Sequence, residues 1–144
     1  MSDVEERFAH ALHGAARSWR QAIDRRLKYL GMSQASWMTI TVAAKESRSL
    51  SQSELADRLG VEGATMVAMI DRLVKAGLVL REPSTVDRRI KHVVVTAAGQ
   101  DLYEAVKAEA AAVRKELLAG IDPHKLEAAT EVLEALSGFV TLVV

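Results

Sequence analysis

Three basic residues, Arg88, Arg89 and Lys91, lie close together in the stretch EPSTVDRRIK. The first half of this stretch is rich in turn formers, so the cations would crowd the tip and edge of a hairpin. Adjacent arginines at such a tip suit the minor groove of DNA, where narrow A·T tracts concentrate negative potential. Asp87 is expected to bond the loop backbone or an arginine and so to set the shape of the tip. The alternative is a solvated basic turn that has no partner.

The segments around this turn are expected to form a hairpin that follows two helices. Residues 78–81 (LVLR) and 90–96 (IKHVVVT) have the composition of short strands. Before them, two helical patterns meet at Gly60, where a chain leaving a helix often needs positive φ. Ser51 or Ser53 can cap the first helix. The second helix is expected over about residues 62–76, and Gly77 can end it.

The second helix of the pair has two distinct faces. Apolar side chains at helical spacing would face the core, namely Met66, Ile70, Leu73 and Val74. The opposite face would enter the major groove, and its candidate DNA contacts are Ala64, Thr65, Ala68, Met69 and Arg72. Ser51 and Ser53, at the start of the preceding helix, complete the candidate set. Two ordinary core helices are the alternative for the pair alone, but a basic hairpin directly after it favours DNA.

This stretch resembles the winged helix-turn-helix of the MarR family of bacterial regulators. The string DRRIKHVVVT is similar to that family's wing signature, which has an Asp, an Arg, a Lys and a closing Thr at this spacing. Upstream, RSWRQAIDRRLKYLGMSQASWMTI resembles the SlyA-like branch. The resemblance implies a homodimer that binds a pseudo-palindromic operator and usually acts as a repressor. It also implies that Arg89 enters the minor groove and that Thr65 is the small hydroxyl residue early in the recognition helix.

One departure from the SlyA-like pattern concerns base reading. Those proteins often carry an arginine on the recognition helix where this sequence has Ala68. Arginine can bond guanine bidentately, a contact worth roughly 1–3 kcal/mol of discrimination, whereas alanine offers only apolar contact. We therefore expect the site to be read less through guanine contacts and more through the wing and the shape of the DNA.

Composition and charge narrow the class of protein. The chain has 144 residues, 49% of them hydrophobic, which is one domain's length with enough apolar content for a core and an oligomer interface. It has no cysteine, so disulfides and thiol redox sensing are excluded. No run approaches the about 20 apolar residues that span a bilayer, and the charged start MSDVEERF lacks a secretory core, so a cytoplasmic protein is expected. Residues 51–92 hold 7 basic and 6 acidic side chains. DNA affinity must therefore come from the positions of individual cations rather than from the net charge of this segment.

The flanking segments are expected to form a dimerisation region. Helical patterns run over about residues 4–29, 34–47 and 97–118, and Asp122-Pro123 starts a last helix. Gly99, near the start of the third of these helices, is interpreted as steric relief. The apolar end FVTLVV needs covering, and a partner subunit is the simplest cover, with intrachain packing as the alternative. We expect residues 1–32 to form an N-terminal dimerisation helix, residues 33–96 a winged helix-turn-helix and residues 97–144 C-terminal dimerisation helices. The fold expected is mainly α with a small β-hairpin wing.

The sequence gives no motif for catalysis, cofactor binding or metal binding. His10 and His13 have i, i+3 spacing, but no third ligand is obvious, so surface or interface histidines are expected. No nucleophile elbow or phosphate-cradling glycine loop occurs.

Regulation by a small molecule is implied by the resemblance. SlyA-like proteins commonly respond to small aromatic acids bound between the dimer helices and the reading domain. Arg17 and Trp37 fall in the matching segments and offer a cation for a carboxylate and an aromatic wall. A surface arginine and a core tryptophan are the alternative. Two other functions stay open for the chain as a whole: a winged-helix module that binds protein, and a nucleoid-type DNA protein that does not select an operator.

Overall fold

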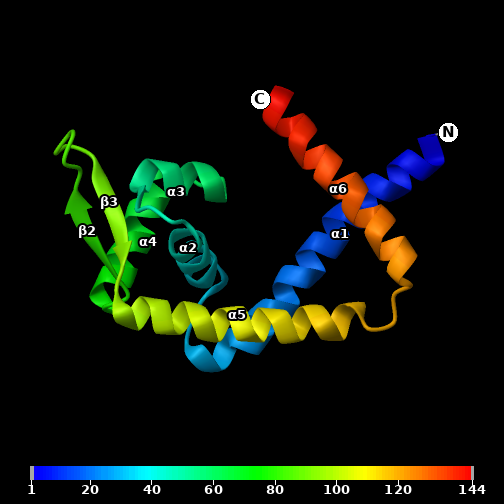
Figure 1. Cartoon of the computed structure of the whole chain (residues 1–144), viewed down its shortest axis with the longest axis horizontal. Coiled ribbons are helices and arrows are strands. Elements are labelled where there is room, and N and C mark those ends of the chain that lie inside the picture. Colours follow the sequence, from blue (N-terminus) through cyan, green and yellow to red (C-terminus); the bar gives the residue numbers. More distant parts are fainter. Residues whose placement is uncertain (1, 144) are drawn as a thin grey trace. The chain divides into compact units, whose positions relative to one another are not determined.

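The chain is mainly helical and contains one small antiparallel sheet (Figure 1). The structure, a computed structural model, describes the backbone of residues 2–143 and the side chains of residues 3–138. The chain divides into two compact units, Met1–Val113 and Arg114–Val144. The fold class predicted from the sequence, helices with a small β wing, is confirmed.

The first unit holds most of the helices, and their ends follow local sequence signals. In chain order they are α1 (Ser2–Leu27), the 3-10 turn η1 (Lys28–Leu30), α2 (Gln34–Lys45), α3 (Gln52–Leu59), α4 (Gly63–Lys75) and most of α5 (Ala97–Leu118). Gly31 ends η1 with a φ of 69°. The Ser33 hydroxyl accepts a hydrogen bond from the Ser36 amide and caps α2 as expected.

The sheet has three strands in the order β1 (Leu50–Ser51), β3 (Lys91–Val95) and β2 (Val79–Pro83). β2 and β3 form the predicted hairpin, from Val79 opposite Val95 to Pro83 opposite Lys91. The strand β1 was not predicted, because two residues are too few to show an alternating pattern. Pro83 is tolerated in β2 because this strand lies at an edge of the sheet.

One apolar core joins the helix pair to the sheet. Each element contributes a side chain that is at most 2% exposed: Leu27 from α1, Ile40 from α2, Leu55 from α3, Ile70 from α4 and Val93 from β3. On α5, Val106 and Val113 are buried as well. The helices that carry the candidate DNA contacts are therefore fixed to the hairpin by shared burial, since each such side chain contributes about 1.5–3 kcal/mol on burial.

The start of α5 is pressed against the base of the hairpin. The Thr96 hydroxyl donates to the Gly77 carbonyl at 2.7 Å and accepts from the Gly99 amide at 3.1 Å. A Cβ on Gly99 would lie 2.1 Å from the Leu78 carbonyl oxygen and 2.8 Å from Val95 Cγ1. The interpretation of Gly99 as steric relief is confirmed, since no larger residue fits without moving backbone.

The second unit consists of the end of α5 and the helix α6 (Pro123–Val143). Asp122 Oδ1 accepts from the His124 amide at 3.0 Å, so the predicted cap before Pro123 is present. Val132, Leu133 and Leu136 are exposed on α6, at 47%, 42% and 38%. The apolar end FVTLVV, residues 139–144, lies outside the residues whose side chains are described. Within the described residues, no helix is long and apolar enough to cross a bilayer.

We predict that Gly99→Ala destabilises the protein by about 1–3 kcal/mol, because the added methyl group must displace the Leu78 carbonyl. Gly14→Ala is the matched control: this glycine lies inside α1 with nothing within 4 Å of the added atom. That control should be neutral or stabilise by up to about 1 kcal/mol. Urea unfolding at one protein concentration measures both, and an unchanged midpoint for Gly99→Ala would contradict the steric account.

Candidate nucleic-acid interface

The helix α3 is set in place by a complete capping box at its first turn. The Ser51 hydroxyl accepts from the Glu54 amide at 3.1 Å, and Glu54 Oε1 accepts from the Ser51 amide at 3.0 Å. Arg48 donates to the same carboxylate, with a distance of 3.2 Å from its Nη1 to Oε1. These bonds hold the pKa of Glu54 at about 2, first through Arg48 and then through the Ser51 amide.

This capping changes the role expected of Ser51. Its hydroxyl is used by the helix and the residue is only 8% exposed, so the side chain is not offered to DNA. Ser53 is exposed and keeps its place among the candidate contacts. The serine that caps the helix and the serine that faces solvent are therefore different residues, which the sequence left open.

The two faces of α4 are arranged largely as expected, with one correction. Met66, Ile70 and Leu73 are buried, while Ala64, Thr65, Ala68 and Arg72 are exposed. Met69 was predicted to lie on the DNA face, and this was wrong: it is 4% exposed. Its sulfur accepts from the Ser36 hydroxyl of α2 at 3.5 Å and lies 3.9 Å from Arg72 Nη2. The buried face is formed by Met66, Met69, Ile70 and Leu73, whereas Val74, which was predicted to belong to it, is only partly buried.

Arg81 links the hairpin to both helices of the pair. From β2 its Nε donates to the Gln52 side chain of α3, and its Nη2 donates to the Val67 carbonyl of α4 at 3.1 Å. The same Nη2 lies 2.6 Å from Asp71 Oδ1, also on α4. One guanidinium group therefore fixes the exposed face of α4 relative to the wing, with the multiple directed donors that only arginine offers.

The wing, residues 84–90 between β2 and β3, is shaped by side chains of its own. Ser84 Oγ accepts from the amides of Val86 and Asp87 at 3.1 and 3.3 Å. Asp87 accepts from the Arg89 amide at 3.0 Å, and its two oxygens accept from Arg89 Nε and Nη2 at 3.1 and 2.9 Å. The predicted role of Asp87 in shaping the tip is confirmed. The Arg89 guanidinium lowers the pKa of Asp87, and the Asp87 carboxylate raises the pKa of Arg89.

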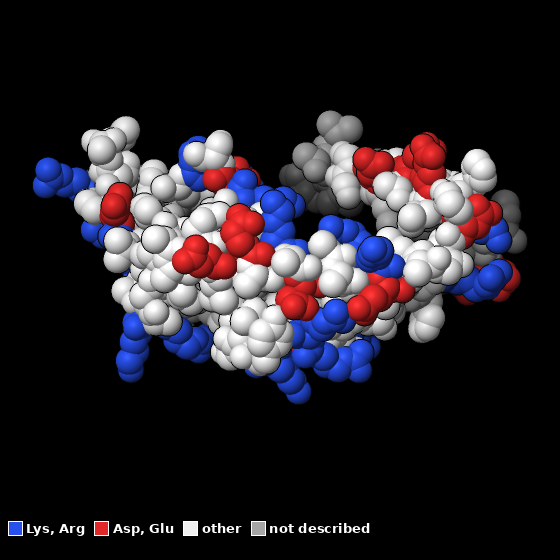
Figure 2. All heavy atoms as spheres, turned by 60° about the horizontal axis from the view of Figure 1, so that its bottom comes forward, with Lys and Arg blue, Asp and Glu red and all other residues white. Residues whose placement is uncertain are grey.

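The cations of the wing stay open to solvent. The Arg89 side chain is 91% exposed although Asp87 bonds it. Arg88 in the wing and Lys91, the first residue of β3, are exposed as well. Figure 2 shows acidic and basic side chains mixed over the face in view, with a basic side chain projecting at the left end, where Figure 1 has the hairpin tip. This face carries no continuous basic patch. The exposed cations are instead gathered at the tip of the hairpin.

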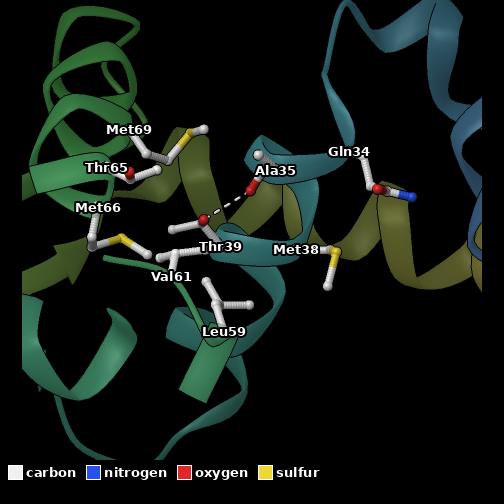
Figure 3. Close-up of a pocket in the computed structure, with 9 residues that line it drawn as sticks. All are labelled: Gln34, Ala35, Met38, Thr39, Leu59, Val61, Thr65, Met66 and Met69. Atoms are coloured by element: carbon white, nitrogen blue, oxygen red, sulfur yellow. Dashed lines mark hydrogen bonds between the residues drawn. The ribbon is translucent and has the colours of Figure 1, made fainter. Parts of the chain in front are cut away.

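The two residues expected to hold an aromatic acid are not brought together in a cavity. Arg17 is exposed on α1, whereas Trp37 is 8% exposed and belongs to the core. Trp37 Nε1 is buried without a hydrogen-bond partner among the described residues. Neither residue lines the cavity around Met38 and Met66 (Figure 3) or the cavity around Glu46 and Gln100. The expectation of an open aromatic wall at Trp37 was therefore wrong, and the core alternative holds for it. Among the described residues, no three His, Asp or Glu side chains are grouped to hold a metal ion.

Sequence reasoning missed Arg81 and Arg48, although a signal for Arg81 was present. Alternate residues of a strand share a face, so Arg81 lies on the same side of β2 as the fully buried Val79. A charged side chain on an inward face requires partners, which Gln52 and Asp71 supply. No comparable pattern marks Arg48, because it lies between α2 and β1 and its partner Glu54 lies beyond β1, in α3.

The helices α3 and α4 meet at Gly60, which has a left-handed φ of 66°, and a hairpin with a cationic tip follows them. This arrangement defines the winged helix-turn-helix class. Comparisons with known proteins agree with this class. Residues 34–91 match the model of the MarR family. The solved transcriptional regulator PA3341 is 38% identical over 93% of this chain and 98% of that chain, with a TM-score of 0.84. The chain belongs to the MarR family.

More distant structures share the fold. MepR from S. aureus, solved as a DNA complex, is 18% identical over 91% of this chain and 96% of that chain, with a TM-score of 0.79. CouR from Rhodococcus jostii RHA1, solved bound to p-coumaroyl-CoA, is 21% identical over 90% of each chain, with a TM-score of 0.76. At these identities the likeness shows the fold alone.

We predict that Glu54→Gln removes part of the acid sensitivity of the protein. Because the folded pKa of Glu54 is lowered to about 2, its stabilising effect is present above the unfolded pKa of about 4.3 and is lost as pH falls toward 2. The expected effect is below about 1 kcal/mol, since the Glu54 side chain is 37% exposed. Urea unfolding at pH 5 and at pH 3 should show a larger loss for the native chain than for Glu54→Gln; equal losses would contradict the assignment.

Proposed function

We propose that this protein is a sequence-specific DNA-binding transcription regulator that acts as a homodimer on a pseudo-palindromic operator, usually as a repressor. The observation that carries the proposal is the rigid joining, through Arg81, of an exposed helix face to a cationic hairpin tip. A helix of this kind enters the major groove while the wing reaches the neighbouring minor groove or backbone. Membership of the SlyA-like branch is part of the proposal and rests on the sequence resemblance.

The exposed face of α4 would supply few polar contacts to bases. Thr65 and Arg72 are its polar members among the proposed contacts, and Ala64 and Ala68 add small apolar surface. An alanine at position 68 offers a thymine methyl group a contact but offers guanine no hydrogen bond. Ser53 on α3 adds one exposed hydroxyl.

The wing would carry more of the affinity than the helix. Arginine has five N–H donors, and Asp87 accepts from two of those on Arg89, so three remain for the floor or the phosphates of a minor groove. The carboxylate also limits the rotamers of Arg89, so less side-chain entropy is lost when DNA binds. Arg88 and Lys91 would contact phosphates beside it.

We predict that Arg89→Ala weakens operator binding by about tenfold and lowers the slope of log affinity against log salt by about 1, because one phosphate or groove contact is lost. Lys45→Ala is the control, since it removes the same charge from an exposed position at the end of α2, outside both the proposed DNA contacts and the proposed dimerisation segments. Fluorescence anisotropy on the protein's own upstream DNA, at two salt concentrations, measures both variants. Unchanged binding by Arg89→Ala would refute the role of the wing.

The same titrations separate the rival functions. A protein-interaction module would bind neither the upstream DNA nor an unrelated duplex. A nucleoid-type protein would bind both equally and lose both equally with salt. An operator-selective regulator binds the upstream DNA far more tightly, typically by a factor of about 1,000 or more.

The dimer interface is proposed to be formed by residues 1–32 and 97–144. The support for it in the second unit is the exposed set Val132, Leu133 and Leu136 on α6, which solvent would not stabilise. A twofold dimer would place two recognition helices about one turn of DNA apart, roughly 34 Å.

We predict that Leu136→Glu converts the dimer to monomer at micromolar concentration, because it puts a charge into a buried apolar contact. Glu134→Gln, two residues away on the same helix, is the control and should remain dimeric. Sedimentation equilibrium measures the mass of each. A dimer of Leu136→Glu with unchanged dissociation constant would place the interface elsewhere.

Control by a small aromatic molecule completes the proposal. CouR was solved bound to p-coumaroyl-CoA, which supports the idea that this fold accommodates small-molecule ligands. Such a ligand must bind the DNA-competent and the DNA-incompetent arrangements with different affinity. Arg17, exposed on α1, remains the cation proposed for an acidic effector, without Trp37 as its wall.

A further inference from the structure

The reading domain, residues 33–96, is joined to the proposed dimerisation segments at two places. The chain enters it from α1 through the 3-10 turn η1 and leaves it into α5 after Thr96. The end of α1 crosses α5 (Figure 1), and there the carboxylate of Glu109 on α5 bonds both α1 and η1. This carboxylate therefore lies at the junction between the part that would read DNA and the parts that would form a dimer.

Glu109 uses its two oxygens on two different elements. Its Oε2 accepts from Arg26 Nε of α1 at 3.0 Å, and its Oε1 accepts from the Tyr29 hydroxyl of η1 at 2.9 Å. The pKa of Tyr29 is raised, first of all by this hydrogen bond to Glu109. Tyr29 is 68% exposed, so its ring is held by its polar end rather than by burial. Hydrogen bonds to a charged group are short and directed, and the pair fixes how α1 and η1 lie against α5.

The other attachment of α5 lies at the base of the hairpin. There Gly99 is pressed against the Leu78 carbonyl, and the Thr96 hydroxyl donates to the Gly77 carbonyl. Glu109 follows Gly99 by ten residues on the same helix, which is about 15 Å along its axis at a rise of about 1.5 Å per residue. Two attachments separated in this way stop the reading domain from swivelling about α5, which a single attachment would allow.

Apolar packing at the junction does not supply the same direction. Leu27 of α1 is fully buried and Val106 of α5 is 2% exposed, so burial holds the elements together. Burial has no direction and tolerates small rotations. The side chains of Arg26 and Glu109 are 39% and 26% exposed, and ion pairs near the surface contribute little to stability. We therefore expect the bonds of Glu109 to act on the geometry of the junction more than on the free energy of unfolding.

We infer that Glu109 is a positioning residue: by holding α1 and η1 against α5, it sets the separation of the two recognition helices and so decides which half-site spacing the dimer accepts. The inference rests on the proposed function, since it needs a homodimer and a two-part operator. Helices α1 and α5 both belong to the segments proposed for the dimer interface, so a rotation at the junction moves each reading domain relative to the twofold axis. One added base pair turns a half-site by about 35° and moves it by about 3.4 Å, so a small rotation changes the spacing that fits.

The separation of the recognition helices can be measured without DNA. The chain has no cysteine, so Lys75→Cys, at an exposed position on α4, carries one spin label per protomer. Double electron–electron resonance then gives the distribution of distances between the two labels of a dimer. We expect a narrow distribution in the otherwise native chain. Adding Glu109→Ala should make it at least about twofold wider, because the reading domains then populate several orientations.

Two further variants separate the role of Glu109 from a general effect on α5. Glu104→Ala is the matched control, because Glu104 is an exposed glutamate that accepts from Gln100 of the same helix at 3.2 Å. It should keep the narrow distribution. Tyr29→Phe keeps the ring and removes one of the two bonds, so it should give an intermediate width. A distribution for Glu109→Ala as narrow as that of the native chain, or equal broadening by Glu104→Ala, would overturn the inference.

The preference for spacing is measured on the same proteins. Inserting one base pair between the half-sites of the upstream DNA should weaken binding by the native chain by about tenfold or more, because a rigid dimer cannot follow the shift. Glu109→Ala should bind the original spacing about threefold more weakly and lose at most about threefold more on the insertion, since a flexible dimer adapts to both. Weaker binding with an unchanged ratio between the two spacings would indicate a merely structural role and would contradict the assignment.

The outcomes distinguish this inference from the proposed function. A native dimer that does not bind the upstream DNA refutes the proposed function, and the label distances still test Glu109. A native chain that binds DNA equally well at both spacings overturns the inference alone. A native chain that is monomeric on DNA overturns both.

Discussion

The position of Arg81 is the constraint on which the proposed DNA-binding surface depends. Its guanidinium group bonds Gln52 on α3 and both the Val67 carbonyl and Asp71 on α4, while its own backbone belongs to β2. Apolar burial alone would hold these elements together but would tolerate sliding, because it has no direction. Directed bonds from one planar group fix the angle between the helix and the wing. The two parts can then meet adjacent grooves without further ordering when DNA binds.

This constraint matters because the surface itself carries little charge. A binding surface with near-zero net charge cannot rely on bulk attraction to phosphate, so a few correctly placed cations must carry the affinity. Asp87 contributes by holding Arg89 in one orientation, although its carboxylate offsets part of the positive charge of the arginine. Ala68 removes a common base contact from the helix. The wing therefore becomes the more important half, and fixing the wing relative to α4 becomes essential.

The helices and strands could be predicted from the sequence better than the exposure of individual side chains. The helix pair, the glycines that end its helices and the hairpin each have short-range signals, and all were found. Met69 lies at the border of the buried face of α4, and its burial depends on α2 residues that are distant in sequence, such as Ser36. The pattern within α4 alone therefore misplaced it. Trp37 was misread for the same reason, since its burial depends on the assembled core. The strand β1 pairs with residues more than 40 positions further along the chain, and Arg81 bonds Gln52 across 29 positions, so neither has a local signal in the sequence.

The most direct test of this account is the DNA affinity of Arg81→Met, which keeps most of the apolar stem and removes the directed bonds. Arg58→Met is the control, because it breaks an ion pair with Glu46 that lies away from the α4–hairpin contact and outside the proposed dimerisation segments. The account predicts that Arg81→Met keeps a native circular dichroism spectrum and loses about tenfold in operator affinity, or about 1.4 kcal/mol, while Arg58→Met stays within about twofold of the native chain. Native affinity in a folded Arg81→Met protein would contradict the claim that this arginine prepares the surface for DNA.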